Sequence, residues 1–160
     1  MNVLWAPWRM AYVSGAQPAS GCVFCQALSA HDDAKHWILA RTGQAFLMLN
    51  AYPYSSGHLM AVTSRHVASP EELDDEEHLD LMRLTRRGLA GLRAAYRPDG
   101  FNLGMNIGRA AGAGVEGHLH LHIVPRWTGD TNFMPVVGSV KVMPESLDET
   151  FRRLLPHVTP

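Results

Sequence analysis

The sequence predicts an α+β fold in which an antiparallel sheet packs against one long helix. Three strand-like segments precede a long amphipathic segment, and two more strand-like segments follow it. No internal repeat or linker interrupts the 160 residues, so residues 1–160 are expected to form a single domain. Hydrophobic residues make up 46% of the chain and charged residues 18%, a balance typical of a globular protein with its own core.

The first part of the predicted sheet is a meander of short apolar segments bounded by turn residues. Its three strands are HWILAR (36–41), AFLMLN (45–50) and HLMAVTS (58–64). Thr42-Gly43 forms a turn between the first two strands, and YPYSSG (52–57) breaks the chain before the third. These three strands are therefore expected to be neighbours in the sheet.

A long helix is predicted from about Asp75 to Tyr96. Small and apolar residues recur every three or four positions along one of its faces: Leu81, Leu84, Gly88, Leu92 and Ala95. The segment SPEE (69–72) has the pattern of a helix start, with a capping serine, a proline at the first helical position and a glutamate at the third. The segment PDG (98–100) is expected to end the helix.

Two further strands and a short helix complete the predicted fold. FNLGMNIG (101–108) alternates apolar residues with asparagine and glycine, as a strand with one buried face would. The glycine-rich RAAGAGVEG (109–117) leads into the strand HLHLHIV (118–124). A serine and a glutamate with the spacing of a capping box predict a C-terminal helix over residues 146–156.

Composition limits the partners and the compartment that we expect. The formal net charge of −1 provides no general field for nucleic acid or an anionic membrane. No run of about 18 apolar residues is present, and the start of the chain has no signal-peptide pattern, so a cytoplasmic protein is expected. Residues 1–21 carry Trp5 and Trp8 and are expected to form an N-terminal arm that packs on another surface.

The only two cysteines, Cys22 and Cys25, form a C-x-x-C pair. Because nothing indicates secretion, a structural disulfide is the weaker interpretation. We interpret the pair as half of a metal site or as a redox pair, and the alternative is two reduced cysteines without a metal.

Three histidines alternate with leucines at the start of the last predicted strand. Residues two apart on a strand point to the same side, about 6.6 to 6.8 Å apart, so His118, His120 and His122 are expected to share one face. Three interpretations are open: a polar face that happens to be rich in histidine, a metal site, and nucleophilic catalysis by a neutral imidazole.

The glycine-rich loop before these histidines favours catalysis. Its glycines, which leave backbone N–H groups accessible to phosphate oxygens, are Gly108, Gly112, Gly114 and Gly117. The loop, the histidines and the neighbouring asparagine-bearing strand together indicate attack by a histidine on a phosphorus atom.

The chain resembles the histidine triad family over nearly its whole length. The matching segments are NAYPYSSGHLMAV (50–62), GMNIG with the glycine loop (104–117) and HLHLHIV (118–124). The similarity is greatest to the branch that contains the diadenosine tetraphosphate phosphorylases and the fragile-histidine-type hydrolases. Its phosphorylase side is favoured by LWAPWRMAYV (4–13), PRWTGDTNF (125–133) and GSVKVMPESL (138–147). The resemblance implies a five-stranded antiparallel sheet, one long and one short C-terminal helix, and a homo-oligomer.

The resemblance also implies two-step nucleotidyl transfer from a dinucleoside polyphosphate such as diadenosine tetraphosphate. His120 would attack the α-phosphate and hold the nucleotide covalently until water or phosphate releases it. His122 would donate a hydrogen bond to a phosphate oxygen as charge builds there, and His118 and His58 would support the site. The further residues implied in nucleotide binding are Asn50, Asn106, Gly112, Gly114 and Trp127.

One position departs from the family pattern. Four residues before the triad, hydrolases of the family usually carry glutamine and phosphorylases can carry serine, but this chain has Gly114. A side-chain contact to phosphate is absent there unless backbone N–H groups replace it, so water and phosphate both stay open as acceptors.

The resemblance further implies a structural zinc ion and no organic cofactor. Several bacterial members and the galactose-1-phosphate uridylyltransferases bind zinc with a C-x-x-C pair, a histidine after the third strand and the first triad histidine. The corresponding residues, which suit a closed tetrahedral site, are Cys22, Cys25, His66 and His118. Two rival functions remain: a hydrolase with a catalytic metal on the triad, and a nucleotide-binding module without turnover.

Overall fold

The computed structural model describes residues 21–130 and 143–158, and it confirms the predicted α+β fold. Five strands form one antiparallel sheet in the order β1-β2-β3-β5-β4. The strands are β1 (Ile38–Arg41), β2 (Ala45–Leu49), β3 (Leu59–Thr63), β4 (Gly100–Gly104) and β5 (His120–Arg126). The helices are α2 (Val23–Ser29), α3 (Asp75–Tyr96) and α5 (Leu147–Val158), with 3-10 turns η1 (Pro70–Glu72) and η2 (Arg109–Ala111).

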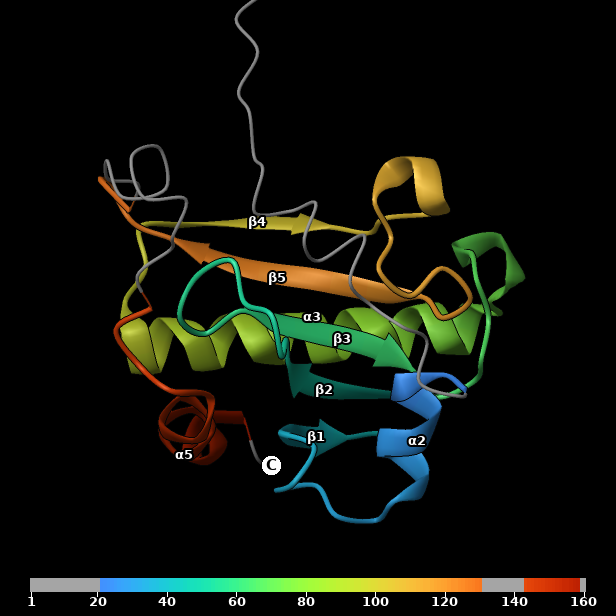
Figure 1. Cartoon of the computed structure of the whole chain (residues 1–160), viewed down its shortest axis with the longest axis horizontal. Coiled ribbons are helices and arrows are strands. Elements are labelled where there is room, and N and C mark those ends of the chain that lie inside the picture. Colours follow the sequence, from blue (N-terminus) through green and yellow to red (C-terminus); the bar gives the residue numbers. More distant parts are fainter. Residues whose placement is uncertain (1–20, 131–142, 159–160) are drawn as a thin grey trace, which may run out of the picture.

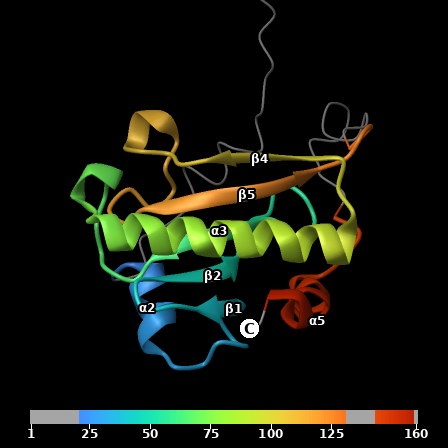
Figure 2. The same ribbon diagram turned by 180° about the vertical axis from the view of Figure 1, so that it is seen from behind.

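The long helix α3 covers one face of the sheet. It runs behind the strands in Figure 1 and in front of them in Figure 2, while α5 lies at one end of the sheet and α2 at the other. Leu81, Leu84 and Leu92 of α3 are buried in one cluster with Leu121 and Ile123 of β5. The leucine-bearing side of the histidine strand therefore forms core, as the alternation predicted.

The opposite face of the sheet carries the triad histidines. Met60 pairs with His122 and Val62 pairs with His120 across β3 and β5, so these four side chains share a face. A second buried cluster on this face includes Phe24 of α2. Helix α2 therefore packs beside the histidines rather than on the face that α3 covers.

The start of α3 differs from the predicted cap. Asp74 is the N-cap residue: its carboxylate accepts a hydrogen bond from the backbone N–H of Glu77, and the Glu77 carboxylate accepts one from Asp74. The predicted start lies in the separate turn η1, where the Ser69 hydroxyl donates to Glu71. The prediction of a serine cap was wrong because the chain returns to an extended conformation directly after Pro70–Glu72.

The strand predicted over residues 101–108 is shorter than expected. β4 ends at Gly104, and Leu103 and Ile107, predicted to be buried, are each 47% exposed. β4 lies at the edge of the sheet, so its outer side has no strand to pack against in the part of the chain that is described. Part of the face that was predicted to be buried is therefore exposed in the described part of the chain.

The C-terminal helix was predicted by its cap. Ser146 and Glu149 form the expected hydrogen bonds, and α5 continues past Pro156 to Val158. The N-terminal arm with its two tryptophans lies outside the described residues. The helices in the described part of the chain include no candidate membrane span.

Candidate active site and metal centre

His120 lies at the start of β5 with its imidazole almost fully buried. Its Nδ1 lies 2.8 Å from the carbonyl oxygen of His118, so Nδ1 carries the proton and donates it to that carbonyl. The Nε2 atom of the neutral ring therefore holds a lone pair. Burial lowers the pKa of His120 below the ordinary value of histidine, which favours this neutral form. The ring of Phe24 packs against it with centroids 5.0 Å apart.

His122 carries its proton on the other nitrogen. The backbone N–H of Tyr54 donates to Nδ1 of His58 at 3.0 Å, so the proton of His58 is on Nε2. That Nε2 lies 3.0 Å from Nδ1 of His122 and donates to it. In its neutral form, His122 therefore has an N–H donor at Nε2. Asn50 lies behind this pair, with its amide nitrogen 3.5 Å from Nδ1 of His58.

The His118 ring lies away from the other two triad rings, in a cluster with the cysteines. Its Nδ1 is 3.2 Å from Sγ of Cys22 and 3.5 Å from Sγ of Cys25, while its Nε2–H donates to the carbonyl of Thr63 at 2.7 Å. His118 precedes β5 and is fully buried. The backbone carbonyl of His118 accepts the hydrogen bond from Nδ1 of His120.

Four side chains from three separate parts of the chain meet in a compact cluster. Sγ of Cys22 and Cys25 and one ring nitrogen each of His66 and His118 all lie within 4.8 Å of one another. Sulfur–nitrogen contacts of 3.2, 3.3 and 3.5 Å join them. Tetrahedral zinc with ordinary bond lengths would hold sulfur and nitrogen about 3.5 Å apart, so these residues fit the ion.

The surroundings of this cluster also suit a metal. Because Nε2 of His118 donates to the Thr63 carbonyl, Nδ1 is the nitrogen left to bind an ion. Cys22 and Cys25 are not joined by a disulfide, and burial raises the pKa of the Cys25 thiol. A bound cation would reverse that shift by stabilising the thiolate.

Gly117 shapes the edge of the cluster, a role that the sequence did not reveal. A Cβ atom at this position would lie 3.2 Å from Nε2 of His66. The absence of a side chain at Gly117 therefore lets the His66 ring lie where its Nδ1 faces Cys25 at 3.3 Å.

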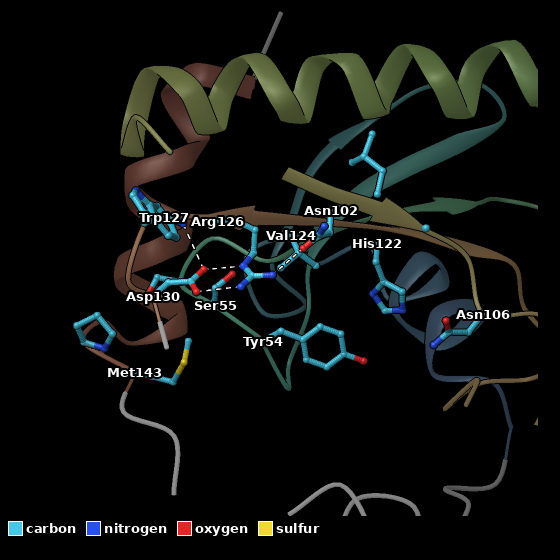
Figure 3. Close-up of a pocket in the computed structure, with 14 residues that line it drawn as sticks. Tyr54, Ser55, Asn102, Asn106, His122, Val124, Arg126, Trp127, Asp130 and Met143 are labelled. Atoms are coloured by element: carbon cyan, nitrogen blue, oxygen red, sulfur yellow. Dashed lines mark hydrogen bonds and ion pairs between the residues drawn. The ribbon is translucent and has the colours of Figure 1, made fainter. Parts of the chain in front are cut away.

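A cavity of about 630 Å³ opens beside His122, over β4 and β5. Figure 3 shows Asn106 and His122 at one end of it and Trp127, Asp130 and Met143 at the other. His122 lines this cavity, whereas the buried His120 does not. The cavity thus lies next to the N–H donor.

The structure distributes the predicted nucleotide-binding residues over three places: the cavity, the region behind His58 and the glycine-rich loop. Asn106 and Trp127 line the cavity, and the Asn106 amide donates to the carbonyl of Gly112 at 3.3 Å. Asn50 lies outside the lining, behind His58. Gly112 has φ +84°, a conformation that favours glycine, and Gly114 is exposed on the loop before His118.

Three cavity residues were not predicted as a group. Arg126 donates two hydrogen bonds to Asp130, at 2.6 and 2.9 Å, and one to Asn102 at 2.8 Å. Arg126 and Asp130 are only four residues apart, so the sequence could have suggested their ion pair. The contact of Arg126 with Asn102 depends on the pairing of β4 with β5, which the sequence does not show. Tyr54 also lines the cavity, with its ring 5.9 Å from that of His122.

Comparison with known proteins identifies the family of this chain. The family model of the HIT domain matches residues 32–129. The chain is 41% identical over 162 residues to the AP-4-A phosphorylase of Mycobacterium tuberculosis, covering 95% of this chain and 81% of that protein. It is 31% identical over 105 residues to an adenosine 5'-monophosphoramidase of Schizosaccharomyces pombe, covering 66% of this chain and 74% of that protein.

The fold comparison agrees with the sequence comparison. The structure of a Zn-bound histidine triad family protein from Mycobacterium smegmatis superposes with a TM-score of 0.70 at 24% identity, covering 88% of this chain and 95% of that one. A five-stranded sheet with alternating histidines at the start of β5 defines the class of histidine triad folds. The chain belongs to the HIT family. At the level of that family, the predicted nucleotide-processing enzyme is confirmed.

Proposed function

We propose that the protein transfers a nucleotidyl group from a dinucleoside polyphosphate, such as diadenosine tetraphosphate, to water or phosphate through His120. The observation that carries this proposal is the hydrogen bond from Nδ1 of His120 to the His118 carbonyl at 2.8 Å. It fixes the ring and leaves Nε2 as the nucleophilic atom. The named phosphorylase relative, 41% identical, supports the substrate class.

The proposed reaction has two displacement steps. Nε2 of His120 attacks the α-phosphorus; a P–N bond forms, and the P–O bond to the leaving nucleoside polyphosphate breaks. Water or phosphate then attacks the same phosphorus and breaks the P–N bond, which returns the electron pair to Nε2. Diadenosine tetraphosphate would yield ATP first, followed by AMP with water or ADP with phosphate.

His122 is proposed to stabilise the charge that develops on phosphate oxygens. Nε2 of His122 carries the proton because His58 donates to Nδ1 of His122 at 3.0 Å, and His58 is itself held by the backbone of Tyr54. A donor fixed in advance stabilises a developing charge without reorganisation. Asn50, Asn106, Gly112, Gly114 and Trp127 stay proposed nucleotide contacts.

We further propose that Cys22, Cys25, His66 and His118 hold a structural zinc ion. Bound there, the ion would link α2, the loop after β3 and the start of β5, and four protein ligands would leave no position for water. Among the described residues, this is the group with metal-ligand geometry, and it excludes His120 and His122. That geometry supports a structural metal over a catalytic metal on the triad.

The direct test uses diadenosine tetraphosphate with and without phosphate. ATP with ADP only when phosphate is present would identify a phosphorylase, and ATP with AMP in its absence a hydrolase. Substrate labelled in the α-phosphate should label the wild-type protein. His120→Asn should lower turnover on the order of 10³-fold or more and abolish the label, while the exposed control His78→Asn should change neither.

The rival functions predict other outcomes. A catalytic metal on the triad would make a chelator abolish turnover while circular dichroism shows an intact fold. A binding module would bind nucleotide but release no product from either a phosphoanhydride or a phosphoramidate. The expected homo-oligomer is a separate proposal, supported by the open edge strand β4 and testable by light scattering.

A further inference from the structure

We infer that the cavity over β4 and β5 binds the leaving half of the substrate, a nucleoside polyphosphate, and that Arg126 contacts that half. The inference rests on the proposed nucleotidyl transfer. The leaving half is the part of the dinucleotide that departs when His120 becomes bonded to the nucleotide. The other half stays on His120 and lies outside the cavity.

The cavity lies on the side of His122 and not on the side of His120. In a phosphoryl displacement, the attacking atom and the leaving oxygen lie on opposite sides of the phosphorus. His122 lines the cavity and His120 does not. From His122 the cavity continues along the same face of β5 to Arg126, which is about 13 Å away at ordinary strand spacing. A leaving group that departs past His122 therefore enters the cavity.

Arg126 provides the cavity with a cation and with hydrogen-bond donors. It is the only lysine or arginine among the described residues that line the cavity. Its guanidinium has five N–H donors, and the hydrogen bonds to Asp130 and Asn102 use three of them. Figure 3 shows the side chain held between these partners, across the cavity from Asn106. Contacts with the described residues therefore leave two donors on a group whose orientation is already fixed, which suits phosphate or ribose oxygens.

The remaining lining fits a nucleoside better than a small leaving group. Tyr54 and Trp127 border the cavity, and aromatic rings are the side chains on which nucleobases stack. The Trp127 ring is held by an edge contact with Tyr96, with centroids 6.5 Å apart. A volume of about 630 Å³ is also far larger than an amine or a water molecule needs.

Two substrates with the same transferred half and different leaving groups test this assignment. Diadenosine tetraphosphate releases ATP, whereas adenosine 5'-phosphoramidate releases ammonia, and His120 would accept AMP from both. The readout is the ratio of kcat/KM for the dinucleotide to kcat/KM for the phosphoramidate. Arg126→Met should lower this ratio about tenfold, as expected for losing hydrogen bonds to a charged group.

Two further variants make the comparison specific. Arg126→Lys keeps the positive charge but not the planar set of donors, and should lower the ratio less than Arg126→Met. The control is Arg152→Met, which removes an exposed arginine of α5 and should leave the ratio unchanged. If Arg126→Met does not fold, the lysine variant carries the test.

Each other outcome has a distinct meaning. An unchanged ratio in Arg126→Met, whether kcat/KM falls equally for both substrates or for neither, would overturn the assignment of the cavity to the leaving half. Turnover of the phosphoramidate alone by the wild-type protein would overturn it too, while leaving histidine-mediated transfer intact. Turnover of neither substrate would instead refute the proposed function.

Discussion

Adding a single methyl group at Gly117 would test the metal centre. An ideal Cβ at this position lies 3.2 Å from Nε2 of His66 and 3.6 Å from its Cε1. Gly117 does not have a positive φ, so alanine fits the backbone, and the His66 ring supplies its close contacts. Gly117→Ala therefore acts on one proposed zinc ligand while leaving all four ligands in the chain.

The size of the effect follows from the distances. A Cβ contact between 3.0 and 3.4 Å is tighter than nine in ten real ones, so the His66 ring must move by a few tenths of an ångström. Zinc–ligand distances tolerate deviations of about 0.2 Å. Changes just outside the ligands of a metal site lower affinity about 10- to 100-fold. We expect the low end, a tenfold loss or about 1.4 kcal/mol.

A competition titration against a chromogenic zinc chelator would measure this loss. Gly43→Ala is the matched control, because a Cβ there meets nothing within 4 Å, and its affinity should equal that of the wild type. Unchanged affinity in Gly117→Ala would refute the described position of His66. If Cys25→Ser also bound zinc as tightly as the wild type, the metal centre itself would be refuted.

Three further predictions concern stability. Gly57→Ala should cost about 2–4 kcal/mol in urea unfolding, because Gly57 has φ +80° and its Cβ would lie 2.8 Å from Cδ2 of Leu92; a loss below about 1 kcal/mol would contradict the packing. Arg65 holds the pKa of Glu77 at about 2, below its ordinary 4.5, so this carboxylate stabilises the fold above pH 4.5 and loses that effect as the pH falls toward 2. Glu77→Gln should therefore be less stable at neutral pH and show a shallower loss of stability in acid; an acid profile parallel to that of the wild type would refute this. Ser146→Ala should lower the free energy of unfolding by about 1 kcal/mol through loss of the α5 cap, and an unchanged urea midpoint would count against the cap.

Local patterns predicted the elements well, because each depends on nearby residues. The apolar repeat placed α3 at Asp75–Tyr96, where the structure has it. Its cap was mispredicted because two successive segments have the same spacing of a capping residue and a glutamate, one starting at Ser69 and one at Asp74. The ion pair between Arg65 and Glu77, at 2.7 Å, supports the second segment. That contact comes from another part of the chain, so helix-start rules alone could not have favoured it.

The candidate site was predictable only in part for the same reason. Alternation placed His120 and His122 on one face, and the register of β3 with β5 agrees. Alternation could not show that the ring of His118 turns into the cysteine cluster, since Cys22 is 96 positions away and meets it only in the folded chain. Nor could it show the cavity, whose wall includes Met143 from beyond β5.

The structure gives neighbouring histidines of one strand opposite tautomers. His120 carries its proton on Nδ1, because the carbonyl of His118 accepts it, and so offers a lone pair at Nε2. His122 accepts at Nδ1 from His58, and so offers a proton at Nε2. Two residues of the same type thus present different groups at Nε2, a lone pair on His120 and a proton on His122, with ring centroids 4.9 Å apart. The ring of His118 is held at Nδ1 by the cysteines and at Nε2 by Thr63, so the carbonyl that orients the proposed nucleophile belongs to a proposed metal ligand.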